Sequence, residues 1–253
     1  KSISALSLPN INISGTLNPC LGKGTTLTAS GGVTYVWGNG TIGNSITVNP
    51  TTSTTYAVTA TGSNGCISSH SVLVSPMPSP SVTITGGAPI CQGETAIITA
   101  SGGNSFLWST GMNGATISAT VSGTYTVTVT NSIGCTATSS VSLVVNPTPI
   151  AQIEGNSTIC EGGSTTLLAS GGTSYLWSNN ATTPEILINP TQSGSYSCTV
   201  TNNFGCHSVI SKPITIVPLP TAELYGGNQF CEGTSLNLTA AGGDSYIWND
   251  STT

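Results

Sequence analysis

An internal repeat limits the possible folds of this chain more than any other feature, and its period is about 70 residues. One tryptophan per copy recurs at nearly equal steps, at Trp37, Trp108, Trp177 and Trp248. Each tryptophan follows a cysteine at one constant spacing, and these cysteines are Cys20, Cys91, Cys160 and Cys231. A second cysteine follows the first at a nearly constant spacing, at Cys66, Cys135 and Cys206. A fixed period of this length predicts one small structural unit that is copied along the chain.

Within a copy, short runs of β-forming residues alternate with glycine and proline turns, as residues 81–147 illustrate. The predicted strands of this copy are 81–85, 94–100, 106–108, 122–130 and 136–145. In 122–130, Tyr125, Val127 and Val129 share one strand face, and threonines occupy the other. Strands this short with closely spaced turns are typical of a β-sandwich, and no helical period of useful length occurs. The sequence therefore predicts an all-β chain.

Proline-bearing links separate the copies, at 75–80, 146–149 and 217–220. Because proline fixes φ and favours extended backbone, we expect semi-rigid spacers and a rod of successive units. The predicted boundaries are 1–9 for the closing strand of a preceding repeat, 10–78 for repeat 1, 79–148 for repeat 2, 149–219 for repeat 3 and 220–253 for the first half of repeat 4. We expect the chain to be a window onto a much longer protein.

Charge is scarce, and this excludes several classes of partner. Only 4% of the residues are charged, with three Lys and Arg against eight Asp and Glu and a formal net charge of -5. Binding to nucleic acid or to an acidic membrane surface needs clustered basic residues, so neither is expected. No apolar run is long enough to span a bilayer, and we expect residues 1–9 to be a strand and not a secretory signal, since Lys1 is followed by a strand-like alternation. Eight cysteines at regular spacing favour an oxidising, extracellular compartment.

Several strings resemble a known family. ICQGETAIITASGG (90–103), an aromatic-x-Trp strand and SGTYTVTVTNSIGC (122–135) resemble the immunoglobulin-like repeats of giant Bacteroidetes cell-surface proteins, such as gliding-motility adhesins and other cargo of type IX secretion. The resemblance spans the three complete copies and the partial fourth. Departures are NPCLGKGT (18–25), where other copies have an acid or Gln after the cysteine, and the additional Cys198. The resemblance implies tandem immunoglobulin-like β-sandwiches, export to the bacterial cell surface and an adhesive or spacer role.

Aromatic residues are the predicted core. In immunoglobulin-like sandwiches the tryptophan of the third strand packs inside, and we expect the same of Trp37, Trp108, Trp177 and Trp248. An outward sugar-binding platform is the alternative, but it would leave each unit without its largest apolar group. Three tyrosines that resemble a tyrosine corner, with the hydroxyl bonded to nearby backbone, are expected in the core as well: Tyr56, Tyr125 and Tyr196.

Nothing in the sequence indicates catalysis, a metal or a cofactor. His70 and His207 stand at different distances from the preceding cysteine and have no recurring carboxylate partner. Glu94, Glu161 and Glu232 are single acids in a turn, whereas calcium takes six to eight oxygen ligands. We therefore expect no enzyme activity and no cofactor.

The cysteines allow two pairing schemes. Cys198 takes the inward place of Val58 and Val127, so it is expected to be a buried free thiol. Pairing within units would give Cys20–Cys66, Cys91–Cys135 and Cys160–Cys206. Yet the two cysteines of a unit are expected at opposite poles, about 20 Å apart, whereas a disulfide needs Cα atoms within about 7 Å. This geometry favours pairing between neighbouring units, as Cys20–Cys135 and Cys91–Cys206, with Cys66, Cys160 and Cys231 bonding beyond the window.

Three functional hypotheses follow. The first is a tension-bearing stalk or filament segment whose partners are the neighbouring repeats of the same chain, with low charge permitting lateral self-association into fibres. The second is an adhesin whose loops bind glycans or a surface. The third is the spacer of a secreted hydrolase whose catalytic domain lies elsewhere. The sequence favours the first, because the loops are mostly Gly, Ser, Asn and Thr.

Overall fold

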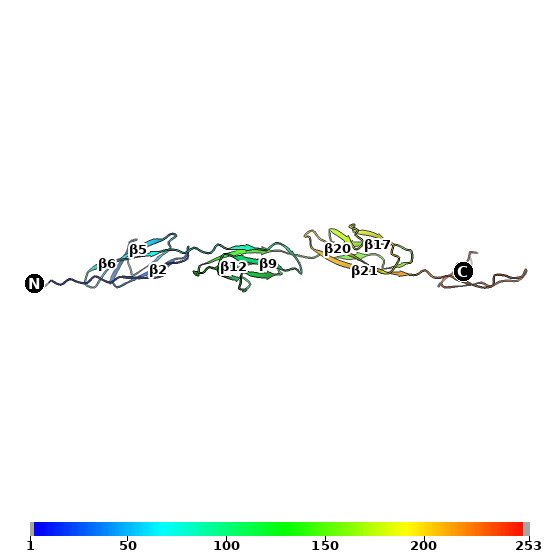
Figure 1. Ribbon diagram of the computed structural model, residues 1–253, viewed down its shortest axis with the longest axis horizontal. Helices are drawn as coiled ribbons and strands as arrows, with labels where there is room; N and C mark the ends of the chain where they lie inside the picture. The colour runs from blue at the N-terminus through cyan, green and yellow to red at the C-terminus, as the bar shows by residue number, and fades with distance from the viewer. Residues whose placement is uncertain (1–2, 250–253) are drawn as a thin grey trace. The chain divides into compact units, whose positions relative to one another are not determined.

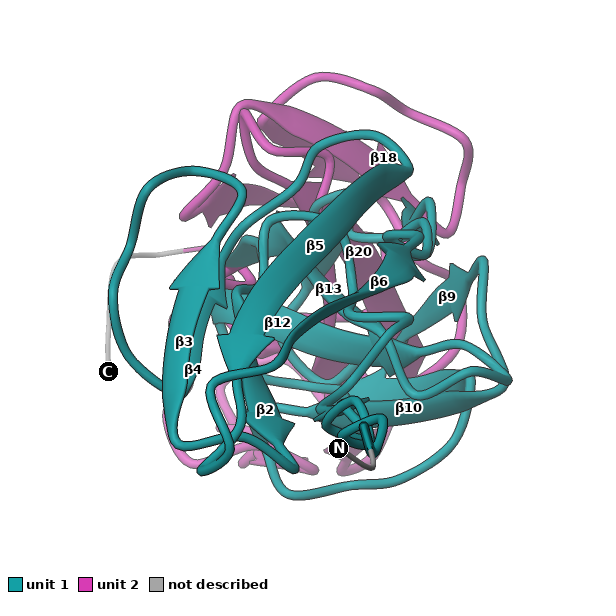
Figure 2. Cartoon of the chain, turned by 90° about the vertical axis from the view of Figure 1, so that its left-hand side faces the viewer, with its two compact units in different colours: residues 1–145 teal, residues 146–253 magenta. Residues whose placement is uncertain are grey.

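The computed structural model describes residues 3–249, and every regular element in that range is a β-strand (Figure 1). No helix in the described range could cross a membrane. The chain divides into two compact units, residues 1–145 and 146–253, which Figure 2 colours separately. Unit 1 contains repeats 1 and 2, and unit 2 contains repeat 3 and the segment after it.

Repeat 1 is built of two antiparallel three-stranded sheets. The first sheet has the order β1 (Asn12–Ser14), β2 (Thr25–Ser30), β4 (Ser45–Val48). The second has the order β3 (Thr34–Trp37), β5 (Thr54–Thr61), β6 (Ile67–Val74). Alternation decides the faces: Leu27 and Ala29 of β2 are buried, whereas Thr26 points outward and its hydroxyl lies 3.1 Å from that of Thr47. Two facing sheets with this strand order are the immunoglobulin-like sandwich.

Repeat 2 has the same two sheets in the same order. The first comprises β7 (Thr83–Thr85), β9 (Ala96–Ser101) and β11 (Thr116–Ala119). The second comprises β10 (Ser105–Trp108), β12 (Gly123–Thr130) and β13 (Thr136–Leu143). Two short strands, β8 (Ile90–Cys91) and β14 (Val145–Asn146), complete the set of strands in this stretch.

Repeat 3 repeats the pattern with one sheet enlarged. Its first sheet comprises β15 (Gln152–Glu154), β17 (Thr165–Ser170) and β19 (Glu185–Ile188). Its second has the order β16 (Thr158–Cys160), β21 (His207–Val217), β20 (Gly194–Thr201), β18 (Ser174–Trp177). β16 pairs in parallel with the end of β21, so the first cysteine of the repeat lies where the chain leaves the repeat.

A glycine pair joins β17 and β18 of repeat 3. Gly171 has φ +100°, and a Cβ there would lie 2.0 Å from the carbonyl oxygen of Ile150. At Gly172 a Cβ would lie 2.5 Å from Cγ1 of Val200. The turn therefore needs glycine twice, once for the left-handed backbone and once for close packing against β20.

Each complete repeat encloses its own hydrophobic cluster, drawn from residues 11–74, 82–145 and 151–216. Trp37, Trp108 and Trp177 are at most 2% exposed and lie at the centre of the three clusters. Tyr56, Tyr125 and Tyr196 are half-buried and pack against the clusters from the side. The chain is thus an all-β protein of tandem immunoglobulin-like sandwiches.

The chain after repeat 3 has only two strands, β22 (Glu223–Tyr225) and β23 (Thr239–Ala241). Trp248, which the sequence predicts to be a core residue, is only half-buried in this structure. No described strand faces β22 and β23 as a second sheet, and a single pair of strands cannot enclose an indole ring. Residues 250–253 lie outside the described range.

The closing strand expected at 1–9 is also absent from the described part of that segment. Residues 3–11 form no strand, because they pair with no other strand, and a lone extended segment has no ladder of hydrogen bonds. Residues 1–2 lie outside the described range. Conversely, the sequence did not predict β11 of repeat 2, in which Ile117 and Ala119 are buried and the residues before each of them are exposed.

Candidate functional site: the joint between repeats 1 and 2

Cys20 lies where the chain leaves repeat 1. The segment before it runs beside the link that follows β6, and the amides of Ser75 and Met77 donate to the carbonyl oxygens of Leu17 and Pro19 at 2.8 Å each. The Leu21 amide in turn donates to the Met77 carbonyl oxygen at 2.8 Å. Cys20 and Met77 form a parallel bridge. Residues 75–77 of the link are therefore held by repeat 1.

Cys135 closes the tight turn between β12 and β13 of repeat 2. The Asn131 amide donates to the Cys135 carbonyl oxygen at 2.9 Å, and the Gly134 amide donates to the Asn131 carbonyl oxygen at 3.1 Å. The Asn131 side chain completes the turn by accepting from the amides of Ile133 and Cys135 at 3.2 and 2.9 Å. Gly134 has φ +85°, a conformation that suits glycine.

The same asparagine also binds the link. Its side-chain nitrogen donates to the carbonyl oxygen of Pro78 at 3.1 Å. Residue 77 is hydrogen-bonded to repeat 1 and residue 78 to repeat 2, so consecutive link residues are fixed from opposite sides. The other two copies repeat the second contact, since Asn64 donates to Ser7 and Asn202 to Pro147, both at 2.8 Å.

A disulfide crosses this joint. Cys20 and Cys135 are bonded, with Cα atoms 5.5 Å apart and a sequence separation of 115. The structure therefore has the inter-repeat partner for Cys20 and not Cys66, the partner within its own repeat. The physical reason is the placement described above, which brings the exit of repeat 1 and the β12–β13 turn of repeat 2 together. Cys91 and Cys206 are also disulfide-bonded.

The remaining cysteines differ sharply in exposure. Cys198 is fully buried opposite Trp177, and burial raises the pKa of its thiol. Cys160 and Cys231 are exposed free thiols, and Cys66 is a half-buried one. Cys160 takes the same place in repeat 3 that Cys20 takes in repeat 1, because the amide of the next residue, Glu161, donates to the Val217 carbonyl oxygen at 2.8 Å.

The aromatic residues predicted for the core also anchor loops. Each buried indole nitrogen donates to a carbonyl oxygen further along the chain, from Trp37 to Gly43, from Trp108 to Gly114 and from Trp177 to Thr183, at 2.9 to 3.0 Å. The Tyr125 hydroxyl donates to the Val121 carbonyl oxygen at 2.8 Å, which is the bond of a tyrosine corner. These contacts are structural, and they engage the N–H group of each indole.

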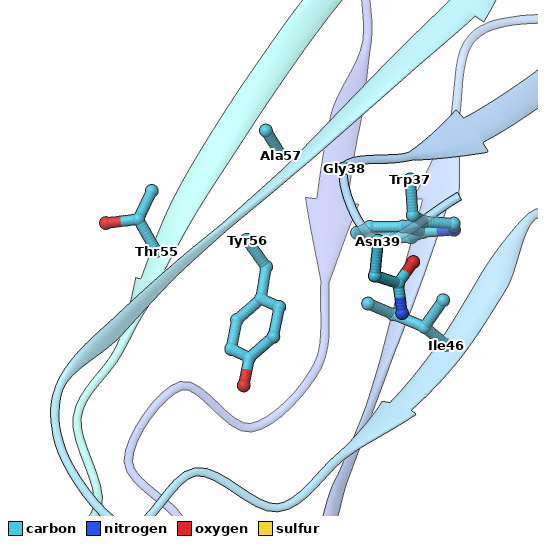
Figure 3. A pocket seen from close by; sticks show the side chains of 7 residues that line it. All are labelled: Trp37, Gly38, Asn39, Ile46, Thr55, Tyr56 and Ala57. Atoms are coloured by element: carbon cyan, nitrogen blue, oxygen red, sulfur yellow. The ribbon is translucent and has the colours of Figure 1, made fainter. Parts of the chain in front are cut away.

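Repeat 1 has a hollow of about 250 Å³ that sequence reasoning missed (Figure 3). Figure 3 shows the Tyr56 ring on one side and Trp37 with Ile46 on the other. The residues at its base are small, because Gly38, which follows β3, faces Ala57 of β5. In repeat 2 the corresponding residues are Ser109 and Thr126, and the Ser109 hydroxyl accepts from the Thr126 amide at 3.2 Å. The sequence signal that could have predicted the hollow is Gly38, at the position where repeat 2 has Ser109.

No Asp, Glu, His, Lys or Arg side chain lines the hollow, and its hydrogen-bonding side chains include those of Asn39, Thr55 and Tyr56. His70 and His207 are both exposed on strands of different repeats. In the described range, no group of three or more His, Cys, Asp or Glu side chains is placed to hold a metal ion. Glu94 has a structural contact, because its carboxylate accepts from the Cys91 amide at 2.8 Å.

No family model matches the sequence, and no curated protein is significantly similar to it. Among solved structures, a 1.5-MDa bacterial ice-binding adhesin is 16% identical, covers 84% of this chain and 99% of its own, and has a TM-score of 0.30. A Ca²⁺-stabilized adhesin by which an Antarctic bacterium binds ice is 13% identical over 87% of this chain and 77% of its own, with a TM-score of 0.35. The insect immune protein hemolin is 14% identical over 79% and 73%, with a TM-score of 0.33. At these values the likenesses decide nothing about the function of this chain.

Proposed function

We propose that this chain is a structural spacer segment of a secreted bacterial cell-surface protein, one that bears tension and holds an adhesive or anchoring element at a distance. The observation that carries the proposal is the disulfide between Cys20 and Cys135, which joins two separately packed sandwiches. A ligand-binding domain does not need a covalent bond to its neighbour, whereas a load-bearing joint gains directly from one.

The hydrogen bonds of the joint support the same function. The link between repeats 1 and 2 contains three prolines and is bound by Leu17, Pro19 and Asn131. A link that is fixed on both sides cannot act as a free tether. The spacing between the two sandwiches is therefore set by protein structure.

The proposed location follows from the cysteine chemistry. Disulfides persist in oxidising surroundings outside the cytosol, and this chain has four bonded cysteines. Export through type IX secretion is the finer part of this proposal and rests on the resemblance of 90–103 and 122–135. We propose no catalytic role, since the large buried side chains serve packing and loop anchoring.

Deleting one repeat tests the spacer function. In the native host protein, removal of residues 79–148 should lower the height of a fluorescent label beyond the segment by about 35 Å, one repeat of strand length plus loops. Height above the membrane can be measured by axial fluorescence interference. A substitution series in surface loops that leaves the repeat number unchanged is the control. If height does not change with repeat number while surface binding is lost, the segment is a binding module.

A second candidate function, binding of a small neutral glycan, is favoured by the hollow in repeat 1 alone. Its walls are apolar and aromatic, and Asn39, Thr55 and Tyr56 provide hydrogen-bonding groups. A glycan array with the full chain, beside the variant Gly38→Ser with Ala57→Thr, tests this function. Binding of a glycan by the wild-type chain that disappears in the variant supports this function. No binding by the wild-type chain excludes it for the glycans on the array.

A further inference from the structure

We propose that residues 3–8 are a closing strand that repeat 1 offers to another immunoglobulin-like sandwich, and that Cys66 forms a disulfide with that sandwich. The partner is a sandwich of this kind that lacks its own closing strand and has a free thiol at the position of Cys20, where the chain leaves it. The proposal concerns what repeat 1 binds at its N-terminal side, and it does not rest on the spacer function.

The segment before repeat 1 is held in the same way as the links between repeats. The Ser7 carbonyl oxygen accepts from the Asn64 side chain at 2.8 Å. The turn asparagines of repeats 2 and 3 donate to the carbonyl oxygens of Pro78 and Pro147 at 3.1 and 2.8 Å. Residue 7 is therefore the structural equivalent of residues 78 and 147, and the residues before it can be compared with the residues before those prolines.

This comparison shows that Ile3 stands at a core position. It lies four residues before residue 7, and Val74 and Leu143 lie four residues before residues 78 and 147. Val74 and Leu143 are 0% and 2% exposed and belong to the cores of repeats 1 and 2, whereas Ile3 is 97% exposed. An apolar side chain at this place in the period therefore lacks the sandwich that it would complete, and a partner can bury it by accepting residues 3–8 as an added strand.

The turn beside this segment is half of a joint. The Gly62 amide donates to the Cys66 carbonyl oxygen at 2.9 Å, which is the bond that closes the turn of repeat 2 at Cys135. Cys135 is bonded to Cys20, at the exit of the preceding sandwich, whereas Cys66 is a half-buried free thiol. The equivalent cysteine of repeat 2 thus shows which group Cys66 would bond, namely the exit cysteine of the sandwich that takes residues 3–8.

The backbone of the segment also matches what such an exit needs. The Leu21 amide donates to the Met77 carbonyl oxygen at the exit of repeat 1, and the Glu161 amide donates to the Val217 carbonyl oxygen at the exit of repeat 3, both at 2.8 Å. Leu6 stands at the position of Met77, one residue before residue 7. Its carbonyl oxygen is therefore the acceptor offered to the amide that follows the partner's exit cysteine.

Disulfide formation needs an oxidant, and a small-molecule disulfide such as oxidised glutathione is of the right class. The thiolate of the partner's exit cysteine attacks one sulfur of the small disulfide, which gives a mixed disulfide and releases one small thiolate. The Cys66 thiolate then attacks the cysteine sulfur of the mixed disulfide and releases the second small thiolate. Two protein thiols are oxidised, one small disulfide is reduced, and the released thiolates take up the two protons.

A chain with one added sandwich tests this proposal. Residues 149–211, which contain repeat 3 up to the middle of β21, are fused ahead of residue 1 of the full chain, so that residues 1–6 take the place of 212–217. The substitution Cys160→Ser in the original part ensures that every Cys160 peptide comes from the added sandwich. After oxidation in a glutathione buffer, peptide mapping without reduction should find the added Cys160 linked to Cys66.

Two matched substitutions test the closing strand in this fusion. Ile3→Asp should abolish the link, because a carboxylate at a core position prevents the added sandwich from closing. Leu8→Asp puts the same charge on the same segment and should keep the link, since Leu8 is 66% exposed and Leu219, its equivalent after repeat 3, is 60% exposed. A reference fusion, with residues 149–217 ahead of residue 7, brings its own closing strand and should form the link as well.

The outcomes separate the two parts of the proposal. A link in both fusions that is lost with Ile3→Asp and kept with Leu8→Asp supports it. A link in the reference fusion alone overturns the assignment of residues 3–8 as a closing strand, and so does a link that survives Ile3→Asp. Absence of the link from both fusions overturns the assignment of the Cys66 turn as half of a joint. None of these results measures height above a membrane, so the spacer function fails separately, in the repeat-deletion experiment.

Discussion

Repeat 3 and the segment after it carry the same sequence signals but differ in structure. Both have an aromatic-x-Trp run, Tyr175 to Trp177 in one and Tyr246 to Trp248 in the other. Trp177 is 1% exposed, whereas Trp248 is only half-buried and its neighbour Ile247 is 87% exposed. The local turn is kept, since the Tyr175 hydroxyl donates to the Gly172 carbonyl oxygen at 2.9 Å and the Tyr246 hydroxyl donates to the Gly243 carbonyl oxygen.

The difference shows what makes the core of a repeat. Trp177 lies in β18 opposite Cys198 of β20, and the sheet of β15, β17 and β19 forms the other side of the sandwich. In residues 220–249, β22 pairs with β23 alone. Turn geometry is therefore a local property of the sequence, but burial of the tryptophan requires strands that come later in the repeat.

The largest expected effect comes from removing the two tryptophans in turn. Trp177→Ala should destabilise repeat 3 by about 3–5 kcal/mol, because it empties the centre of a closed core. Trp248→Ala should leave the free energy of unfolding of repeat 3 nearly unchanged. Denaturant unfolding followed by hydrogen exchange in β20 measures both. Equal effects of the two substitutions on β20 would mean that Trp248 contributes to the stability of repeat 3, against the contrast drawn here.

A smaller effect is expected from the second glycine of the turn. Gly172→Ala places a methyl group 2.5 Å from the Val200 side chain and 2.6 Å from the Thr201 carbonyl oxygen. Such overpacking should cost about 1–3 kcal/mol in unfolding free energy. The matched substitution Gly243→Ala meets nothing nearer than 3.6 Å and should be close to neutral. Thermal melts of the two variants decide between a turn requirement, which both share, and a packing requirement, which only repeat 3 has.

The smallest perturbation is chemical labelling of the free thiols. Cys160 and Cys231 are exposed and should react with iodoacetamide in the folded chain. Cys198 should react only after unfolding, because it is fully buried and burial raises the pKa of its thiol, which keeps the reactive thiolate scarce. As pH rises past the ordinary thiol pKa, ionisation of Cys198 in the unfolded chain should favour unfolding. Mass spectrometry of labelled peptides at several pH values measures how far each of these thiols has reacted. Protection of Cys231 equal to that of Cys198 would contradict the contrast between the two regions.

Much of the strand pattern could be predicted from the sequence. The runs predicted at 122–130 and 136–145 correspond to β12 and β13, because alternation and an intervening glycine turn are local signals. β8 and β16 were missed, since they are two and three residues long and exist only through pairing with a distant segment. β11 was missed because its run of four residues is too short to stand out from the surrounding polar chain.

The cysteines mark the limit of sequence reasoning most clearly. Their spacing predicts two equally regular networks, and the expectation of opposite poles favours the inter-repeat one without excluding the other. The choice for Cys20 depends on Leu17 and Pro19 lying beside Ser75 and Met77, and on Asn131 binding Pro78. The asparagine recurs in the other copies, but the period of the sequence does not say which segment it binds. The hollow beside Tyr56 likewise depends on a contact across the sheet, that between Gly38 and Ala57.

The repeat length, the all-β character, the inward aromatic residues of the complete repeats and the scarcity of charge were all accessible without coordinates, because each follows from composition and short-range spacing. The partner of Cys20 and the enclosure of one tryptophan but not another became clear only from the folded chain. Those outcomes depend on segments that are far apart in the chain and meet only after the strands have paired. Cys20 and Cys135 are 115 residues apart in the sequence, and only the folded chain shows that one bond joins repeats 1 and 2 at this point.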